Sequence, residues 1–247
     1  MNWSGDEMNL LQIRTKFRTL SGRFDLVNAD FTDNGADFML NEGRKFLDML
    51  DETSKSWASA YRFVEVGGFS AQFQYCRAIK EVWAASTTVR WQLEKESFQD
   101  LTALYLEDMP GQRNTGSPGF YSPAITRYIP EGVAVDTFEA YIGWVDVPIG
   151  SAHEYNSILL SVPSDVKLLI EVRGLFYSAE LVEEADENYW SVVHPSLLIM
   201  AAQRQCEIFN RNTQGVNDWT NAIATTMKQL GMDLVEELIA EVSQMGG

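Results

Sequence analysis

The chain has 247 residues, of which 45% are hydrophobic and 22% are charged, a composition typical of a folded globular protein. Its 19 basic and 35 acidic residues give a formal charge of −16, so its surface repels phosphate backbones and tight nucleic-acid binding is not expected. No apolar run approaches the ~18 residues that a membrane-spanning helix needs, and the first residues do not read as a signal peptide. We therefore expect no membrane partner and synthesis in a reducing cytoplasm, where Cys76 and Cys206 are buried apolar residues and not a disulfide.

Two helices are expected in the first 56 residues. Apolar residues recur at steps of three and four over residues 10–24 and again over 36–50, which is the spacing of a helical face. Thr32 or Asp33 can cap the second helix. Gly43 inside that helix costs about 1 kcal/mol relative to alanine. A close approach of another helix would justify this glycine.

The periodicity changes near Trp57, where alternation of apolar and polar residues begins. Two such runs flank Gly67-Gly68, which predicts a β-hairpin formed by residues 61–66 and 69–75. Ser97 can cap a short helix at residues 98–105, and a loop rich in glycine and proline follows. Further strands are expected at residues 79–83, 89–94, 125–129, 138–147, 157–162 and 166–173.

The last third of the chain predicts a helical hairpin. One helix ends near residue 211, a short link containing Gly215 follows, and a second helix continues to about residue 242. The second helix carries an apolar face with steps of three and four, made of Trp219, Ile223, Met227, Leu230, Leu234, Leu238 and Val242.

The predicted fold class is therefore α+β. We expect a helical bundle formed by the N- and C-terminal helices, residues 1–56 and 188–247, with an inserted antiparallel β-rich domain at residues 57–187. Neither helical end is large enough to bury a core alone, which is why the two ends are expected to pack together.

No residue pattern predicts a catalytic, metal or cofactor site. His153 and His194 lack a second ligand at metal-binding spacing, and no nucleophile elbow or phosphate-binding loop is present. Glu94 and Glu96 would share one face of a strand, but a solvated strand edge is the simpler interpretation. The β-rich region also holds aromatic residues that could line a sugar-binding face, although sheet core or subunit interface is their commoner role: Trp83, Trp91, Phe120, Tyr121, Tyr128, Tyr141 and Trp144.

Three groups of residues resemble the head-to-tail adaptor proteins of tailed bacteriophages. The first two groups lie in the middle of the chain, and the third, the more specific one, lies in the C-terminal helices. The groups are Trp91, Leu93, Ser97, Asp100, Leu101 and Tyr105; then Gly116, Pro118, Phe120 and Tyr121; then Trp190, Pro195, Leu197, Leu198, Ala201, Ala202, Glu207, Phe209, Arg211, Asn212, Gly215, Asp218 and Trp219.

The resemblance implies a non-enzymatic structural protein of the virion, located at the head–tail junction and made in the host cytoplasm. Such adaptors form a ring, usually of twelve copies, beneath the portal; the ring extends the DNA channel and offers an attachment surface to the tail. The implied partners are further copies of this chain, the portal protein, and tail or nozzle proteins. DNA would pass through the channel without specific binding, in agreement with the acidic charge. A ring is a closed heterologous assembly, so each copy needs two different complementary faces.

Two segments are candidate partner interfaces. The first is the end of the last helix, with Leu234, Leu238, Val242 and Met245, although for the first three the chain's own core is the simpler interpretation. The second is the loop with Gly116, Pro118, Phe120 and Tyr121, which can also be a simple surface loop. The alternatives to an adaptor are another tail or neck component of the virion, and a carbohydrate-binding virion protein that uses the aromatic residues of the β-rich region.

Overall fold

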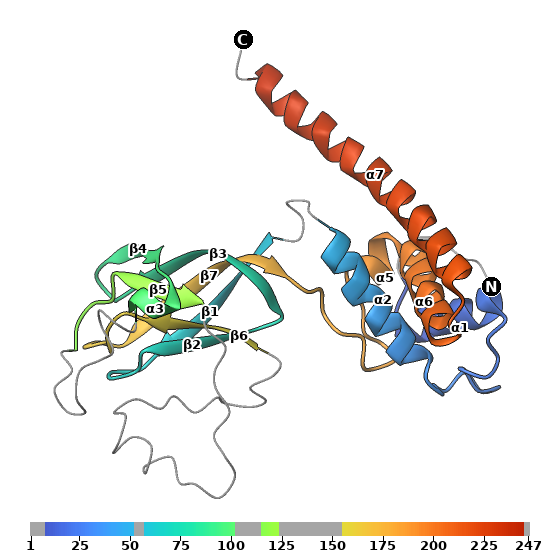
Figure 1. Cartoon of the computed structure of the whole chain (residues 1–247), viewed down its shortest axis with the longest axis horizontal. Coiled ribbons are helices and arrows are strands. Elements are labelled where there is room, and N and C mark those ends of the chain that lie inside the picture. The colour runs from blue at the N-terminus through green and yellow to red at the C-terminus, as the bar shows by residue number, and fades with distance from the viewer. Residues whose placement is uncertain (1–7, 52–56, 102–114, 124–154, 245–247) are drawn as a thin grey trace, which may run out of the picture. The chain divides into compact units, whose positions relative to one another are not determined.

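A computed structural model describes residues 8–51, 57–101, 115–123 and 155–244, with side chains for all of these except residues 155 and 231–244 (Figure 1). The chain divides into two compact units. A helical unit combines Met1–Ser56 with Tyr177–Gly247, and a β-rich unit comprises Trp57–Phe176. Each unit has its own hydrophobic core.

The long helices lie where the apolar periodicity predicts them, except that α1 ends at Ser21 and not near Phe24, and the short α5 was not predicted. The helical unit contains α1 (Leu10–Ser21), α2 (Ala36–Leu50), α5 (Tyr189–Val193), α6 (Pro195–Phe209) and α7 (Thr213–Gln244), and the β-rich unit contains the short α3 (Phe98–Leu101). Asn9 and Gln12 form a reciprocal capping box at the start of α1. The N-cap of α2 is Gly35, and not Thr32 or Asp33 as predicted, although the carboxylate of Asp33 accepts the backbone N–H of Asp37 in the first turn at 2.9 Å.

Gly43 allows α2 and α6 to pack closely. A Cβ atom at this position would lie 2.7 Å from the backbone nitrogen of Ala202 and 2.9 Å from the carbonyl carbon of Ala201. The predicted close helix–helix approach is therefore confirmed. The core around it is made of fully buried side chains from five helices, including Ile13, Phe17, Leu40, Leu47, Trp190, Leu198 and Ile223.

The β-rich unit is one seven-stranded sheet. Its strands are β1 (Trp57–Val64), β2 (Ser70–Gln74), β3 (Cys76–Ala85), β4 (Arg90–Lys95), β5 (Phe120–Pro123), β6 (Tyr155–Leu160) and β7 (Leu168–Phe176). The strand order is β1-β7-β3-β4-β5-β6-β2, with all pairs antiparallel except the parallel pair β4–β5. β1 and β2 lie near each other without pairing, so the sheet is nearly closed into a barrel.

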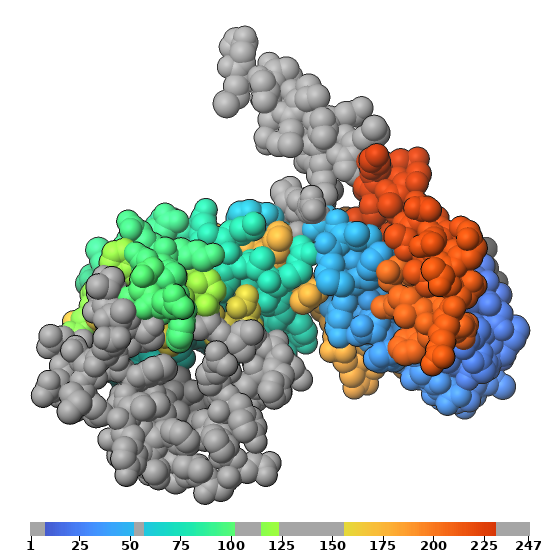
Figure 2. Space-filling model, viewed as in Figure 1, coloured from blue at the N-terminus to red at the C-terminus, as the bar shows by residue number. Residues whose placement is uncertain are grey.

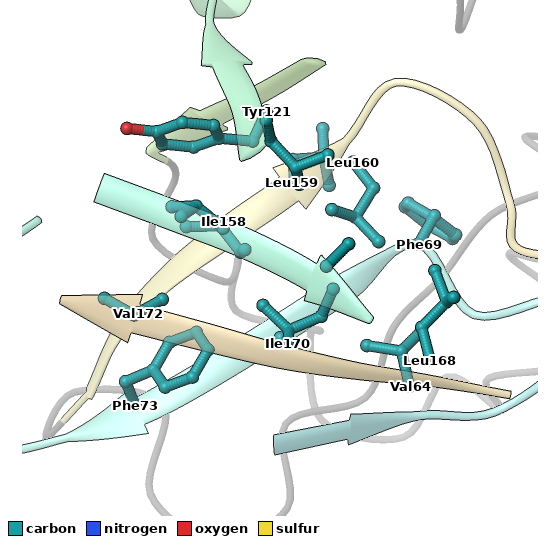
Figure 3. Packing of buried hydrophobic residues seen from close by; sticks show 14 of the residues in the cluster. Val64, Phe69, Phe73, Tyr121, Ile158, Leu159, Leu160, Leu168, Ile170 and Val172 are labelled. Carbon is teal, nitrogen blue, oxygen red and sulfur yellow. The ribbon is translucent and has the colours of Figure 1, made fainter. Parts of the chain in front are cut away.

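The inside of this sheet is filled by apolar side chains from strands far apart in the sequence. Figure 3 shows Val64, Phe73, Tyr121, Ile158 and Ile170 converging from β1, β2, β5, β6 and β7. At Gly174 the neighbouring strand β3 passes so close that a Cβ atom would overlap the carbonyl oxygen of Ala78. A glycine is therefore required where β3 departs from regular register against β7.

The predicted fold class, a helical bundle with an inserted antiparallel β-rich domain, is wrong. The structure has a nearly closed, seven-stranded mixed sheet with a core of its own, together with six helices among the described residues. Only the mixture of helices and strands agrees with the prediction. The sheet is mixed because β5 returns beside β4 in the same direction, with Glu94 opposite Phe120. Alternation reveals which side chains face a core, but it does not specify strand partners or direction.

The predicted hairpin across Gly67-Gly68 is also wrong. The glycines do form a tight turn, in which Gly67 has φ +83° and the N–H of Gly68 donates to the carbonyl of Glu65 at 2.9 Å. However, β1 pairs with β7 and β2 pairs with β6. A turn reverses the chain, but it does not oblige the strands on either side to pair with each other.

Candidate partner-binding interface

The first half of α7 is part of the helical core. Ile223 is fully buried, and Met227 and Leu230, on the same helical face, pack against the core. Arg204 of α6 donates from Nε to the hydroxyl of Thr220 at 2.9 Å, which ties the two helices together. In Figure 2 this part of α7, in red, lies on the viewed surface of the helical unit. The apolar face predicted from the sequence is thus a packing face as far as Leu230.

The second half of α7 extends beyond α6. At ~1.5 Å per residue, 32 residues span roughly 48 Å, whereas the 15 residues of α6 span roughly 22 Å. Figure 1 shows α7 continuing past the end of α6. The candidate residues Leu234, Leu238 and Val242 belong to this second half, where the helix is described but the side chains are not. Met245 lies outside the described residues.

The candidate loop residues take part in the packing of the β-rich unit. Gly116 forms a bridge to the segment after β6. Pro118 is buried, and its carbonyl accepts the indole N–H of Trp91 at 2.8 Å. Tyr121 in β5 is only 2% exposed, and burial raises the pKa of its phenol. Gly116 and Phe120 are partly exposed, so of these four residues they are the ones that a partner can contact.

The tryptophans considered for sugar binding make contacts within the sheet. Trp91 is held by the carbonyl of Pro118, and the ring of Trp83 lies near two guanidinium groups, 4.7 Å from that of Arg90 and 5.7 Å from that of Arg173. These contacts explain both residues without a ligand. Three further candidates lie outside the described residues: Tyr128, Tyr141 and Trp144.

Glu94 and Glu96 lie beside β5 and contribute through their peptide groups. The N–H of Glu94 donates to the carbonyl of Gly119 at 3.0 Å, and that of Glu96 donates to the carbonyl of Tyr121 at 2.9 Å. The carboxylate of Glu94 is exposed. This pair therefore serves to hold β5 in the sheet.

A buried carboxylate in the helical unit was not predicted. Asp48, 4% exposed, accepts the indole N–H of Trp190 at 2.7 Å and two hydrogen bonds of 3.0 Å from the backbone and hydroxyl of Ser178. Burial raises the pKa of Asp48, although these donors and nearby Arg44 oppose the shift. The cluster joins α2 to α5 and to the segment before it. No sequence spacing links residues so far apart along the chain.

A groove of about 390 Å³ lies on the helical unit between α2 and residues 180–182. Asn41 forms one wall and exchanges hydrogen bonds of 2.8 and 3.0 Å with the backbone of Leu181. Asp37 is held by Arg14 at 2.6 Å; burial raises the pKa of Asp37, and Arg14 opposes that shift. The groove has three carboxylates and one amine among its lining residues, which are Asp37, Phe38, Asn41, Glu42, Lys45, Glu180, Leu181 and Val182.

The cysteines are as predicted. Cys76 and Cys206 are buried free thiols, and burial raises the pKa of Cys76 to about 11. His194 packs its ring against Tyr189 and Trp190, while His153 lies outside the described residues. Within the described part of the chain there is no cluster of three or more histidine, cysteine or carboxylate side chains. None of the helices described there is both long and apolar enough to cross a membrane.

Comparison with known proteins gives no assignment. No protein-family model matches the chain, and no curated protein matches its sequence.

Proposed function

We propose that the chain is a structural protein of a tailed-phage virion, a head-to-tail adaptor that forms a ring beneath the portal, extends the DNA channel and presents an attachment surface to the tail. The observation that carries the proposal is α7. Its first half rests on α6, and its second half extends beyond it. A helix that emerges from a folded unit in this way is available to bind another subunit.

The sequence of the second half fits such a role. In the sequence, Leu234, Leu238 and Val242 follow one another at steps of four, as Ile223 and Met227 of the core face do. The same stretch also contains Asp233, Glu236, Glu237 and Glu241. A helix with such a sequence can bind in an apolar groove, and basic residues on the partner would complement its acidic charge.

The residues that resemble phage adaptors also support the proposal, because several of them set the packing of the helical unit. Trp190 is 1% exposed and binds Asp48, and Pro195 is the first residue of α6. Ala201 and Ala202 receive Gly43 of α2. The resemblance therefore rests on residues with a defined structural role, and it suggests a helical scaffold related to that of the adaptors.

The distribution of charge is consistent with a DNA channel. In the described residues, acidic side chains outnumber basic ones in the helical unit, whereas the two kinds are equal in number in the β-rich unit. A channel wall formed by the helical unit would repel the phosphate backbone and let DNA slide.

Native mass spectrometry and electron microscopy with the portal protein of the same phage test the proposal. The wild-type chain is expected to form rings that join portal-containing particles. A triple variant, Leu234→Ser, Leu238→Ser and Val242→Ser, is expected to lose this binding while its circular-dichroism spectrum stays helical. The matched control places three serines on exposed positions of the first half: Asn217→Ser, Ala224→Ser and Lys228→Ser.

A wild-type protein that stays monomeric and never joins portal-containing particles would end the proposal. Crosslinking from position 242 separates the adaptor from its alternative. Contacts to tail proteins alone would assign the chain to the tail or neck instead.

A further inference from the structure

The groove on the helical unit has two exposed apolar side chains among its lining residues. Phe38 of α2 is 55% exposed, and Val182, from the segment on the other side of the groove, is 66% exposed. The groove has a volume of about 390 Å³, which is at the lower end of the range for ligand pockets. A space of this size is suited to one large side chain and not to a whole helix.

Most charged groups of the groove already have partners. Lys45 pairs with Glu42 at 2.8 Å, and Asp37 pairs with Arg14 at 2.6 Å. Glu180 is exposed and forms no ion pair with any residue that the structure describes. The groove therefore combines apolar side chains with a carboxylate that can accept a hydrogen bond.

The start of α1 lies close to this groove. The N–H of Leu10 donates to the carbonyl of Asp186 at 2.9 Å, and the carboxylate of Asp186 accepts the N–H of Val182 at 2.8 Å. Arg14, one turn further along α1, binds Asp37 of the groove. The N-terminal end of α1 is thus held next to the segment that carries Val182, and residues 1–7 precede it in the chain.

Trp3 has the one aromatic side chain among residues 1–7. Seven residues of extended chain, the separation between Trp3 and Leu10, span up to roughly 23 Å. That reach exceeds the path of two hydrogen bonds through Asp186 that joins Leu10 to the groove. An indole has a large apolar surface and a single N–H donor, which match the apolar side chains and the carboxylate of the groove.

We propose that residues 1–7 fold back along the helical unit and place the side chain of Trp3 in this groove. The ring covers Phe38 and Val182, and its N–H donates to Glu180. The docked segment closes the groove to apolar side chains of other molecules. This contact is independent of the adaptor proposal, because it forms within one chain and requires no partner.

Fluorine NMR of the full chain labelled with 5-fluorotryptophan tests the contact. The signal of Trp3 is the one that disappears in Trp3→Phe. In the wild type this signal is expected to lie apart from its position in the urea-unfolded chain, because contacts in the groove change the shielding of the fluorine. Val182→Asp, which places a charge among the apolar side chains, is expected to move the signal to the unfolded position, and Phe38→Ser is expected to do the same.

Val193→Asp is the matched control. Val193 is 52% exposed and belongs to the helical unit, but it does not line the groove, so this variant is expected to leave the Trp3 signal in place. Circular dichroism checks that each variant keeps its helices. A wild-type Trp3 signal at the unfolded position, or one that neither groove variant moves, would overturn the proposal. A displacement that is lost on dilution would also overturn it, since the segment of a second copy would then fill the groove.

Discussion

Replacing Gly43 with alanine tests how tightly α2 and α6 are packed. The added Cβ would lie 2.7 Å from the nitrogen of Ala202 and 2.9 Å from the carbonyl carbon of Ala201. Both are backbone atoms inside α6, so neither can rotate out of the way. Gly43→Ala therefore requires the two helices to separate.

Two energy terms of opposite sign decide the outcome. Alanine is favoured over glycine inside a helix by about 1 kcal/mol. Ordinary contact begins near 3.4 Å, so the contact with the nitrogen of Ala202 must lengthen by about 0.7 Å. Overpacking costs about 1–3 kcal/mol, and the upper end applies here because a whole helix must move. We expect Gly43→Ala to lower the free energy of unfolding by about 2 kcal/mol.

Urea unfolding followed by far-ultraviolet circular dichroism measures this change in the helical unit. Met49, on the same helix and 54% exposed, supplies the control. The free energy of unfolding of Met49→Ala is expected to exceed that of Met49→Gly by about 1 kcal/mol, and this difference measures helix propensity without the packing effect. A Gly43→Ala protein as stable as the wild type, or more stable, would show that the helices are not in the close contact described.

Three further predictions concern other buried positions. Gly174→Ala is expected to abolish cooperative folding of the β-rich unit, because the new Cβ would overlap the carbonyl oxygen of Ala78; a variant with an unchanged β-sheet spectrum would refute this. Trp190→Phe keeps a ring in the core but removes the donor to Asp48, so the free energy of unfolding should fall by about 1–3 kcal/mol, and a loss well below this range would count against the hydrogen bond. Burial raises the pKa of Asp48 in the folded chain, so the proton is bound more tightly there than in the unfolded chain. The contribution of Asp48 to stability is therefore greatest in acid and declines as pH rises through the folded-state pKa. The stability difference between wild type and Asp48→Asn should follow the same decline, and a difference that grows with pH would contradict the direction of the shift.

The helices could be predicted because each one is specified by its own residues. The apolar steps over residues 10–24 and 36–50 are visible in a short window, although the N-cap of α2 is Gly35 and not the predicted Thr32 or Asp33. Even the helix–helix contact at Gly43 could be inferred, since a glycine inside a helix has a known cost that packing must offset.

The strand pairing could not be predicted, because it depends on residues far apart in the sequence. The turn at Gly67-Gly68 is real, yet the partner of β1 begins more than a hundred residues later. A strand has the same alternating pattern whichever strand it pairs with. The pairing is determined by how the side chains pack in the assembled core.

The candidate interface residues show the same limit. Tyr121 belongs to the core, whereas Tyr61 is exposed, but an aromatic residue on an alternating strand has the same sequence signature in either place. The hydrogen bond between Trp190 and Asp48 joins two residues whose individual neighbours give no sign of it. Such pairs become visible only when the distant segments are placed together.

The pairing of β1 with β7 also affects the order in which the chain folds. Because Trp57 is opposite Leu175, the two points at which the chain leaves the β-rich unit lie on neighbouring strands. Bringing together the two ends of this stretch of roughly 120 residues costs about 4 kcal/mol in chain entropy. The folding of the β-rich unit already includes this cost. Its last strand ends at Phe176, so this can happen before α6 and α7 are synthesised. The N-terminal and C-terminal segments that build the helical unit are then connected to neighbouring strands of a sheet that has already formed. We therefore expect the helical unit to form last, as α1 and α2 meet α6 on a nascent chain whose distant parts are close together.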